Sequence, residues 1–275
     1  MMGTVIEVIS PDSRAADIAF GEIERIENLL SLYKEESEIS RLNKQGSLRV
    51  SPQTLLVINK AIKFWGETGG VFDITIAPLV ELWGFYNKDY HIPEDAKIKK
   101  TLSLIGIDKM NLRDNIVEFE VKGMKIDLGA IAKGFAVDCA VRELRLAGID
   151  SALLNAGGDI YCLGNKFGQP WRVAIKSGRN KGFSGYLELS DKAVATSGDY
   201  EQYFVVDQKR YSHILNPKTG RPADSGVVSV TVIVDDCLTA DILATSILIL
   251  GQKKGIDLAK RFNAEVRIIE ETNVR

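Results

Sequence analysis

The sequence predicts an α+β fold with a large, mostly antiparallel sheet and flanking helices. Helical and strand patterns follow one another without the regular β–α alternation that is typical of a parallel sheet. Residues 110–125 alternate like a hairpin that turns at residues 113–115. In the second half, several strand patterns succeed each other with only turn residues between them. These observations together favour antiparallel pairing.

The first half of the chain begins as a strand and continues mainly as helices. Start signals, Gly pairs and the spacing of apolar residues set the expected bounds. The expected elements are a strand at residues 4–9, a helix that starts at residues 10–13 and reaches Tyr33, a helix from Ser51-Pro52 to Gly69-Gly70, and a shorter helix near residues 94–104.

The second half mixes the two kinds of element. Helices are expected at residues 130–146, 237–250 and 254–262, with Gly148 and Gly251 as stop signals. Strands are expected at residues 125–128, 151–154, 171–176, 185–189, 203–206, 210–215, 227–234 and 264–269.

Length and charge limit the class of protein. The chain has 275 residues, and 35 basic against 37 acidic residues leave a net charge of −2. We expect one domain over residues 1–275, with two intertwined sub-domains as the alternative. The charge balance argues against nucleic acid as a partner. No apolar run is long enough for a transmembrane helix, and no signal peptide is recognised at residues 1–9.

The cysteines and histidines are few. Cys139, Cys162 and Cys237 fit no zinc spacing, and we interpret them as small buried apolar residues. His91 and His213 are the only histidines, so a His-rich metal site is excluded. His213 ends a predicted strand before a Pro/Gly turn, where an imidazole can reach a cleft and serve as a general base. A histidine that only belongs to the turn is the alternative.

Two further patterns suggest a ligand site. Neither GxGxxG nor GxxxxGK[ST] occurs, but Gly157 and Gly158 follow a buried strand and allow a ligand to approach the backbone. A tight turn or bulge explains them equally well. Asp241 and Thr245 lie one helical turn apart, and their oxygens suit a hard cation such as Mg²⁺. The alternative is an Asp that stabilises the dipole of its helix.

Several motifs together resemble the ApbE family of FAD:protein FMN transferases. The order in which they occur along the chain is more specific than any one of them. The matching segments are residues 2–4, 72–75 with 78–85, 127–134, 155–159 and 213–222, supported by residues 196–200 and 239–241.

The resemblance implies a flavin site in a cleft between two sub-domains, and a magnesium site. The positions implied to contact FAD are Met2, Tyr33, Val71, Phe72, Asp73, Asp127, Lys133 and Leu215, and Gly157 and Gly158 would approach the same ligand. The implied Mg²⁺ ligands are the carbonyl of Ala130, Asp241 and Thr245. Some relatives have another carboxylate at the position of Ala244, so more water is expected around this ion.

The resemblance also implies the reaction. A Ser or Thr hydroxyl of a target protein would attack the FMN-side phosphorus of FAD, AMP would leave, and His213 would take the proton. A Mg²⁺-dependent FAD pyrophosphatase, with water in place of the hydroxyl, is one alternative. A flavin-binding protein without catalysis is another.

The resemblance further implies a partner and a location. The acceptor is expected to be a flavoprotein subunit of a redox complex. The protein is expected outside the cytoplasm or at a membrane if a signal or lipid anchor has been removed, and in the cytoplasm otherwise.

Overall fold

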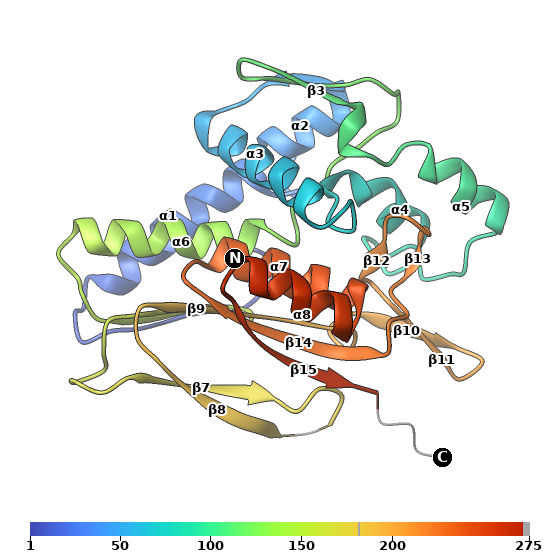
Figure 1. Cartoon of the computed structure of the whole chain (residues 1–275). Coiled ribbons are helices and arrows are strands. Elements are labelled where there is room, and N and C mark those ends of the chain that lie inside the picture. Colours follow the sequence, from blue (N-terminus) through green and yellow to red (C-terminus); the bar gives the residue numbers. More distant parts are fainter. Residues whose placement is uncertain (181, 272–275) are drawn as a thin grey trace. The chain divides into compact units, whose positions relative to one another are not determined.

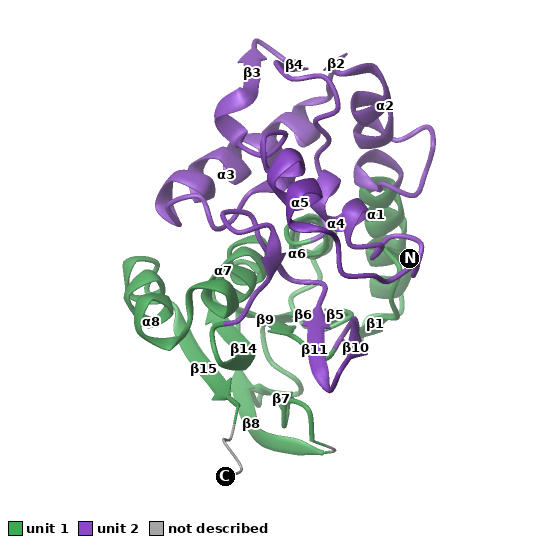
Figure 2. Cartoon of the chain, turned by 90° about the vertical axis from the view of Figure 1, so that its right-hand side faces the viewer, with its two compact units in different colours: residues 1–27, 130–200, 225–275 green, residues 28–129, 201–224 purple. Residues whose placement is uncertain are grey.

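The chain forms two compact units, each made of separate stretches of sequence (Figure 2). Unit 1 comprises Met1–Glu27, Ala130–Tyr200 and Ser225–Arg275. Unit 2 comprises Asn28–Gly129 and Glu201–Asp224. The computed structural model describes residues 1–180 and 182–271. The chain therefore leaves unit 1 twice and returns twice.

Unit 1 is built on a six-stranded sheet in the order β1-β5-β6-β9-β14-β15 (Figure 2). Each neighbouring pair of strands is antiparallel. All eight residues of β14 are buried, as expected for an inner strand covered on both faces. The strands are β1 (Ile6–Ile9), β5 (Ala152–Ala156), β6 (Asp159–Leu163), β9 (Lys192–Gly198), β14 (Val227–Val234) and β15 (Glu265–Glu270).

Helices and a strand ribbon cover the two faces of this sheet (Figure 1). Helix α7 packs against β9 and β14, and α6 packs against β6 and α7. On the other face, Trp171 and Leu187 of the ribbon join Cys162, Val194 and Ile233 of the sheet in one apolar cluster. The elements are α1 (Ala15–Leu30), α6 (Ala132–Leu146), α7 (Cys237–Leu250), α8 (Gln252–Arg261), β7 (Trp171–Lys176) and β8 (Phe183–Leu189).

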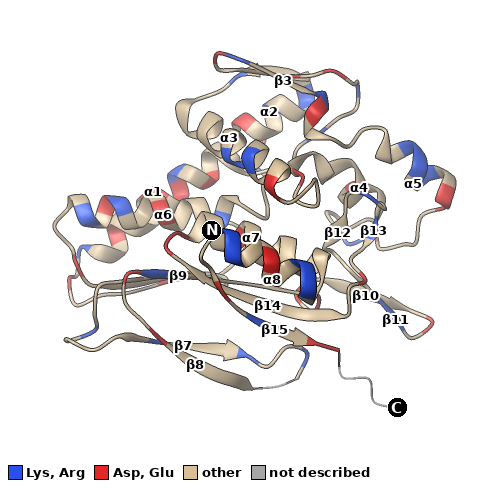
Figure 3. Cartoon of the chain, viewed as in Figure 1, with Lys and Arg blue, Asp and Glu red and all other residues tan. Residues whose placement is uncertain are grey.

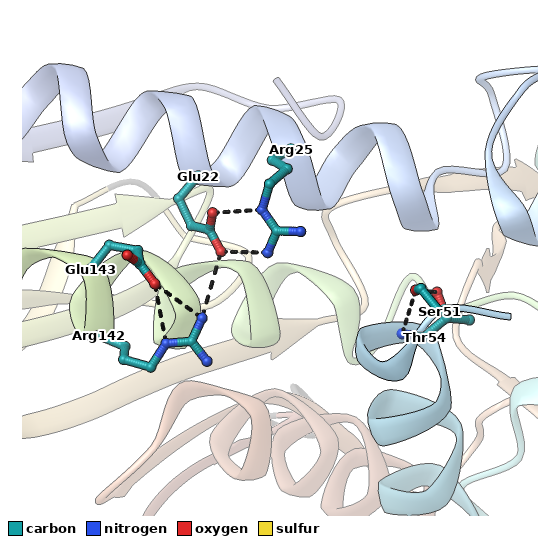
Figure 4. Close-up of polar contacts among 6 residues, drawn as sticks. All are labelled: Glu22, Arg25, Ser51, Thr54, Arg142 and Glu143. Atoms are coloured by element: carbon teal, nitrogen blue, oxygen red, sulfur yellow. Dashed lines mark hydrogen bonds and ion pairs between the residues drawn. The ribbon is translucent and has the colours of Figure 1, made fainter. Parts of the chain in front are cut away.

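Charged side chains join two of these helices. Glu22 of α1 binds Arg25 one turn later at 2.7 Å and approaches Arg142 of α6 at 4.0 Å (Figure 4). Arg142 also binds its neighbour Glu143. Helix α1 carries four acidic residues and one basic residue, whereas α6 carries three basic and two acidic residues. Figure 3 shows these charged positions on both helices.

Unit 2 is mainly helical. Its α3 begins as predicted, because the Ser51 hydroxyl accepts a hydrogen bond from the Thr54 N–H and Pro52 occupies the first turn (Figure 4). The helices are α2 (Glu38–Gln45), α3 (Pro52–Glu67), α4 (Ala77–Leu82) and α5 (Asp95–Leu102), with short 3₁₀ turns η1 (Ile74–Ile76) and η2 (Ile107–Lys109). The strands are β2 (Ser47–Arg49), β3 (Met110–Arg113), β4 (Ile116–Phe119), β10 (Tyr203–Val206), β11 (Lys209–Ser212), β12 (Leu215–Asn216) and β13 (Arg221–Pro222).

An aromatic cluster anchors the second stretch of unit 2. The Trp83 indole donates to the Gly220 carbonyl at 2.8 Å, and Leu215 is buried in the same cluster. A Cβ at Gly220 would lie 2.6 Å from Ile98, and the residue has φ +68°. A glycine is therefore needed where this turn meets α5.

The fold class is confirmed, and most elements lie where they were expected. The predicted strand at residues 125–128 is wrong. This segment has no regular secondary structure, and its backbone bonds to other groups. Ile126 exchanges two hydrogen bonds with the Asn43 side chain, and the Asp127 N–H donates to the Ile74 carbonyl. The helix expected from Ala130 begins at Ala132. In the described ranges no helix is long and apolar enough to cross a bilayer.

Candidate functional site

In unit 1, two buried acids share one lysine. The Lys133 ammonium lies 3.0 Å from Asp159 and 3.5 Å from Asp241, whose side chains are only 4% and 5% exposed. Lys133 comes from the first turn of α6, Asp159 from the first residue of β6 and Asp241 from α7. The first turn of α6, the start of β6 and the buried helix α7 thus bring these three charged side chains together.

The two glycines of the Asn155–Asp159 motif place Asp159. Ala156 pairs with Asp159, so Gly157 and Gly158 are the two loop residues of a tight hairpin. Their φ values are +63° and +106°, a conformation that glycine adopts readily and that suits a two-residue hairpin turn. The tight-turn alternative is therefore what the structure shows, and the turn also puts Asp159 beside Lys133.

A close contact between α6 and α7 places Asp241. A Cβ at Gly134 would lie 2.4 Å from the Cys237 carbonyl oxygen, so only glycine allows the helices to approach this closely. Both oxygens of Asp138 accept backbone N–H bonds from Cys237 and Leu238, at 2.8 and 2.9 Å. These contacts clamp the start of α7 to α6, one turn before Asp241.

The electrostatics of this cluster favour an additional cation. Burial, and then the negative charge of Asp241, raise the pKa of Asp159, and the nearby ammonium of Lys133 opposes the rise. Burial alone would lower the pKa of Lys133, but the two carboxylates hold it above its usual value. The raised pKa keeps Asp159 largely protonated near neutral pH, and a cation bound nearby would favour its ionised form.

The donor atoms fit Mg²⁺ better than a softer metal. Asp241 offers a carboxylate, and Thr245 a hydroxyl that is hydrogen-bonded to Ser197 at 3.0 Å. Ala130 lies two residues before the start of α6 and offers a carbonyl. Within residues 1–180 and 182–271, no group of three or more His, Cys, Asp or Glu side chains forms a metal cluster. An ion here would depend on hard oxygen donors, with phosphate or water completing its shell.

Unit 2 has a pocket of about 420 Å³ beside Tyr33. The Tyr33 and Tyr86 rings meet edge-to-face, with centroids 6.4 Å apart and an interplanar angle of 85°. The volume lies within the range of small-molecule sites. The lining residues are Leu32, Tyr33, Glu35, Ser40, Asn43, Lys44, Ala77, Glu81, Tyr86 and Lys125. Helix α1 ends at Leu30, so Tyr33 lies beyond the helix in which it was expected, with 77% of its surface exposed.

Asp127 is hydrogen-bonded to Tyr86, one of the residues that line this pocket. The Tyr86 hydroxyl donates to one Asp127 oxygen at 2.7 Å, and the Gly129 N–H donates to the other at 2.7 Å. Burial, and then the charge of Asp127, raise the pKa of Tyr86 far above its usual value. Tyr86 therefore stays a neutral donor that fixes the Asp127 carboxylate.

Asp73 serves a local structural role. Its carboxylate accepts hydrogen bonds from the N–H and hydroxyl of Thr75, at 2.8 and 2.6 Å, at the start of a 3₁₀ turn. The Thr75 oxygen also accepts from the Gly106 N–H at 2.7 Å. Burial raises the pKa of Asp73 despite these bonds. Val71 and Phe72, just before it, are buried.

His213 is held in one tautomer. Its backbone N–H and its Nδ1 both lie 3.0 Å from the Gln202 carbonyl oxygen. A carbonyl oxygen only accepts, so Nδ1 carries the proton and Nε2 carries the lone pair of the neutral ring. The Phe85 ring meets the imidazole edge-on, with centroids 6.4 Å apart. This is the tautomer in which Nε2 can act as a base.

The predicted site residues thus form two sets. The set in unit 1 consists of Met2, Ala130, Lys133, Gly157, Gly158, Asp241 and Thr245. The set in unit 2 consists of Tyr33, Val71, Phe72, Asp73, Asp127, His213 and Leu215. In unit 1, the Met2 N–H donates to Glu27, and Lys133 meets Asp241. In unit 2, Tyr33 and Asp127 both contact Tyr86. The cleft between sub-domains stays a prediction.

Two residues of these clusters were missed by sequence reasoning. Asp159 closes the glycine motif, and Tyr86 directly follows the segment 78–85. Both positions were next to a recognised motif. Their partners, Lys133 and Asp127, are far away in sequence, so no local pattern indicated the contact.

Comparison with known protein families and structures identifies the family to which this fold and these residue clusters belong. The model of the ApbE family matches residues 2–269. The chain belongs to the ApbE family. A curated relative from Vibrio cholerae, named FAD:protein FMN transferase, is 38% identical over 259 residues, which cover 91% of this chain and 78% of the relative.

Solved structures agree with this assignment. The flavin transferase ApbE from Vibrio cholerae superposes with a TM-score of 0.88 at 35% identity, covering 99% of this chain and 92% of that one. The ApbE protein of Thermotoga maritima gives a TM-score of 0.90 at 36% identity, covering 98% and 92%. The resemblance seen in the sequence motifs is therefore confirmed.

Proposed function

We propose that this protein is an FAD:protein FMN transferase that moves FMN from FAD to a Ser or Thr hydroxyl of an acceptor protein and releases AMP. The relatives' names support flavin transfer. The observation that carries the proposal is the tautomer of His213, since the Nδ1 bond to Gln202 leaves the basic lone pair on Nε2. A protein that only binds flavin has no need of an imidazole held in this way.

The proposed reaction balances as a phosphoryl transfer. The acceptor oxygen bonds to the FMN-side phosphorus, the bond from that phosphorus to the bridging oxygen breaks, and AMP leaves with that oxygen. The hydroxyl proton passes to Nε2 of His213. FMN remains on the acceptor as a phosphoester.

The unit 1 cluster would hold the charged part of FAD. Lys133 offers an ammonium, whereas the N–H groups of the Gly157–Gly158 turn already donate to the Val5 carbonyl and to the Asn155 side chain. Asp241, Thr245 and the Ala130 carbonyl would hold Mg²⁺, which supplies positive charge to phosphate oxygens when bound. The pocket beside Tyr33 and Tyr86 in unit 2 would suit a flat aromatic ring.

The decisive test is mass spectrometry of a candidate acceptor after incubation with the enzyme, FAD and Mg²⁺. The acceptor should gain the mass of FMN less water, at a Ser or Thr, with one AMP released for each modification. Release of AMP and free FMN with an unmodified acceptor would instead show an FAD pyrophosphatase. Retained FAD with neither product would show a flavin-binding protein.

The acceptor and the location are proposed on the family resemblance alone. We propose a flavoprotein subunit of a membrane-bound redox complex as the acceptor, modified outside the cytoplasm. Fractionation of the native host, followed by mass spectrometry of flavinylated proteins, tests both. Modified proteins found only in the cytoplasmic fraction would contradict the location.

A further inference from the structure

We propose that Gln202 is a positioning residue that selects the reactive tautomer of His213. This inference rests on the proposed function, because it concerns the base of that reaction. Gln202 lies one residue before β10, and His213 one residue after β11, so the two flank the root of the ribbon β10–β11 (Figure 2).

The Gln202 side chain fixes the carbonyl that orients the imidazole. Its amide nitrogen donates to the Phe85 carbonyl at 2.8 Å and lies 3.4 Å from the Tyr90 hydroxyl. Its own backbone carbonyl lies 3.0 Å from both the N–H and the Nδ1 of His213. One residue therefore connects the segment 85–90 to the imidazole through two amide groups.

Aromatic packing holds the rest of the ribbon against the same segment. The Phe204 ring stacks on the rings of Tyr90 and Tyr211, with centroids 5.5 and 5.1 Å apart. The Tyr211 ring in turn packs on the Trp83 ring, with centroids 5.9 Å apart. This stack limits how far the ribbon can move, but it makes no polar contact with the imidazole. The Nδ1 contact with the Gln202 carbonyl favours the Nδ1–H form.

Replacing Gln202 has two separable effects. Gln202→Ala removes the bond to Phe85 without adding charge, so the carbonyl should be less well fixed and the tautomers should mix. Gln202→Glu loses the donor and adds a negative charge, which should stabilise the imidazolium and raise the pKa of His213. The other titratable groups on residues 85–90 and 201–212 are Tyr86, Lys88, Asp89, Tyr90, Glu201, Tyr203, Asp207, Lys209, Arg210 and Tyr211, and both changes leave these residues in place.

The chain offers two matched controls. Gln208 lies in the turn of the same ribbon, is exposed, and has no hydrogen bond among those described for residues 1–180 and 182–271. Gln208→Ala and Gln208→Glu therefore repeat the same chemical changes away from the imidazole. His91 also has its Nδ1 bound to a carbonyl, that of Asp89 at 2.8 Å, and serves as an internal reference.

The experiment measures the histidine tautomers in the full-length protein by long-range proton–nitrogen NMR correlations. Only two histidines occur, so His91→Ala assigns both signals. We expect the Nδ1–H form of His213 in the wild type, a mixture in Gln202→Ala, and no change in the Gln208 variants. An Nε2–H form of His213 in the wild type would overturn the proposal even if no Gln202 variant folds, as would an unchanged tautomer in a folded Gln202→Ala.

Transfer kinetics give the second measurement. Gln202→Ala should lower kcat by about 10- to 100-fold, a typical loss for a residue that orients a reacting group, with the KM for FAD little changed. Gln202→Glu should also move the acidic limb of the pH–rate profile to higher pH. A purely structural role would lower the melting temperature and leave the tautomer and the profile unchanged. If His213→Ala keeps full transfer activity, the base assignment fails, whereas the tautomer result stands by itself.

Discussion

The two clusters of candidate site residues are held in place by different forces. In unit 1, Lys133, Asp159 and Asp241 are charged, buried and fixed by a helix contact that admits no side chain at Gly134. In unit 2, His213 is fixed by neutral hydrogen bonds and ring contacts at the root of a two-stranded ribbon. Charges in the first cluster are coupled, so a change at one should affect all three. In the second cluster, a substitution should mainly change the orientation of the His213 imidazole.

The largest effect is expected from removing the carboxylate of Asp241. Asp241→Ala should abolish Mg²⁺-dependent turnover, a loss of at least about 100-fold if the ion contributes several kcal/mol, while FAD binding partly survives through unit 2. Titration calorimetry with FAD and an AMP-release assay over a range of Mg²⁺ concentrations measure the two properties.

Asp236→Ala is the matched control for this variant. Asp236 caps the same helix by accepting from the Thr239 N–H at 2.9 Å. Its loss should cost about 1 kcal/mol of stability and little turnover. Equal turnover in Asp241→Ala and the wild type would refute the metal assignment.

The next effect concerns His213. His213→Ala should slow transfer by about 10²- to 10⁴-fold, the usual range for a lost general base, while FAD and Mg²⁺ still bind. The loss should shrink as pH rises, because hydroxide can then take the proton. The wild-type rate should fall at low pH, where a protonated imidazole cannot accept one. Profiles of identical shape for both proteins, at saturating FAD and acceptor, would show that His213 is not the base.

A smaller effect tests the helix contact in unit 1. Gly134→Ala should destabilise the protein by about 1–3 kcal/mol, because the added methyl group meets the Cys237 carbonyl and forces α6 and α7 apart. It should also raise the Mg²⁺ concentration needed for half-maximal activity. Gly21→Ala, in α1, is the control: nothing lies within 4 Å of the added carbon, so stability should rise by up to about 1 kcal/mol. Denaturant unfolding measures both, and similar changes in the two variants would contradict the proposed contact.

The smallest effect should come from Asp73. Because burial raises its pKa in the folded state, the native protein binds a proton more tightly than the unfolded chain, and its stability falls as pH rises between the two pKa values. Asp73→Asn keeps an acceptor for Thr75 and removes this titration. The variant should therefore gain stability relative to the wild type as pH rises. The difference in stability should become constant once the pH exceeds the folded-state pKa of Asp73.

Denaturant midpoints measured from acid to neutral pH test this expectation. The exposed Asp224, changed to Asn, should show no such trend. A difference between Asp73→Asn and the wild type that is constant with pH would mean that Asp73 does not titrate within this range.

Periodic elements could be predicted from the sequence, whereas contacts between distant segments could not. The helix Cys237–Leu250 has the predicted bounds, because an apolar run ends at a glycine. The strand β9 (Lys192–Gly198) went unpredicted, since its sequence lacks clear alternation and it is stabilised by pairing with β6 and β14. The segment 125–128 has strand-like residues, but the Asn43 side chain takes the place of a neighbouring strand.

The same distinction applies to the candidate sites. Asp241, Thr245 and His213 could be selected because their residue types and spacing suggest chemistry. The neighbours that decide how these groups behave, such as Asp159 beside Lys133 or Gln202 beside His213, depend on how the chain folds back on itself. Motif matching found the reactive groups but not the residues that orient them or set their pKa values.

The discontinuous units have a consequence for how the protein is made. Strand β1 is synthesised first, yet its partner β5 follows only after the whole first stretch of unit 2, and the edge strand β15 comes near the end of the chain. Unit 2 in turn lacks the ribbon and His213 until residues 201–224 emerge. Neither unit can finish folding on the ribosome early, so long-range closure should make folding slow and leave nascent strands exposed. Chaperone dependence during synthesis would be a natural result.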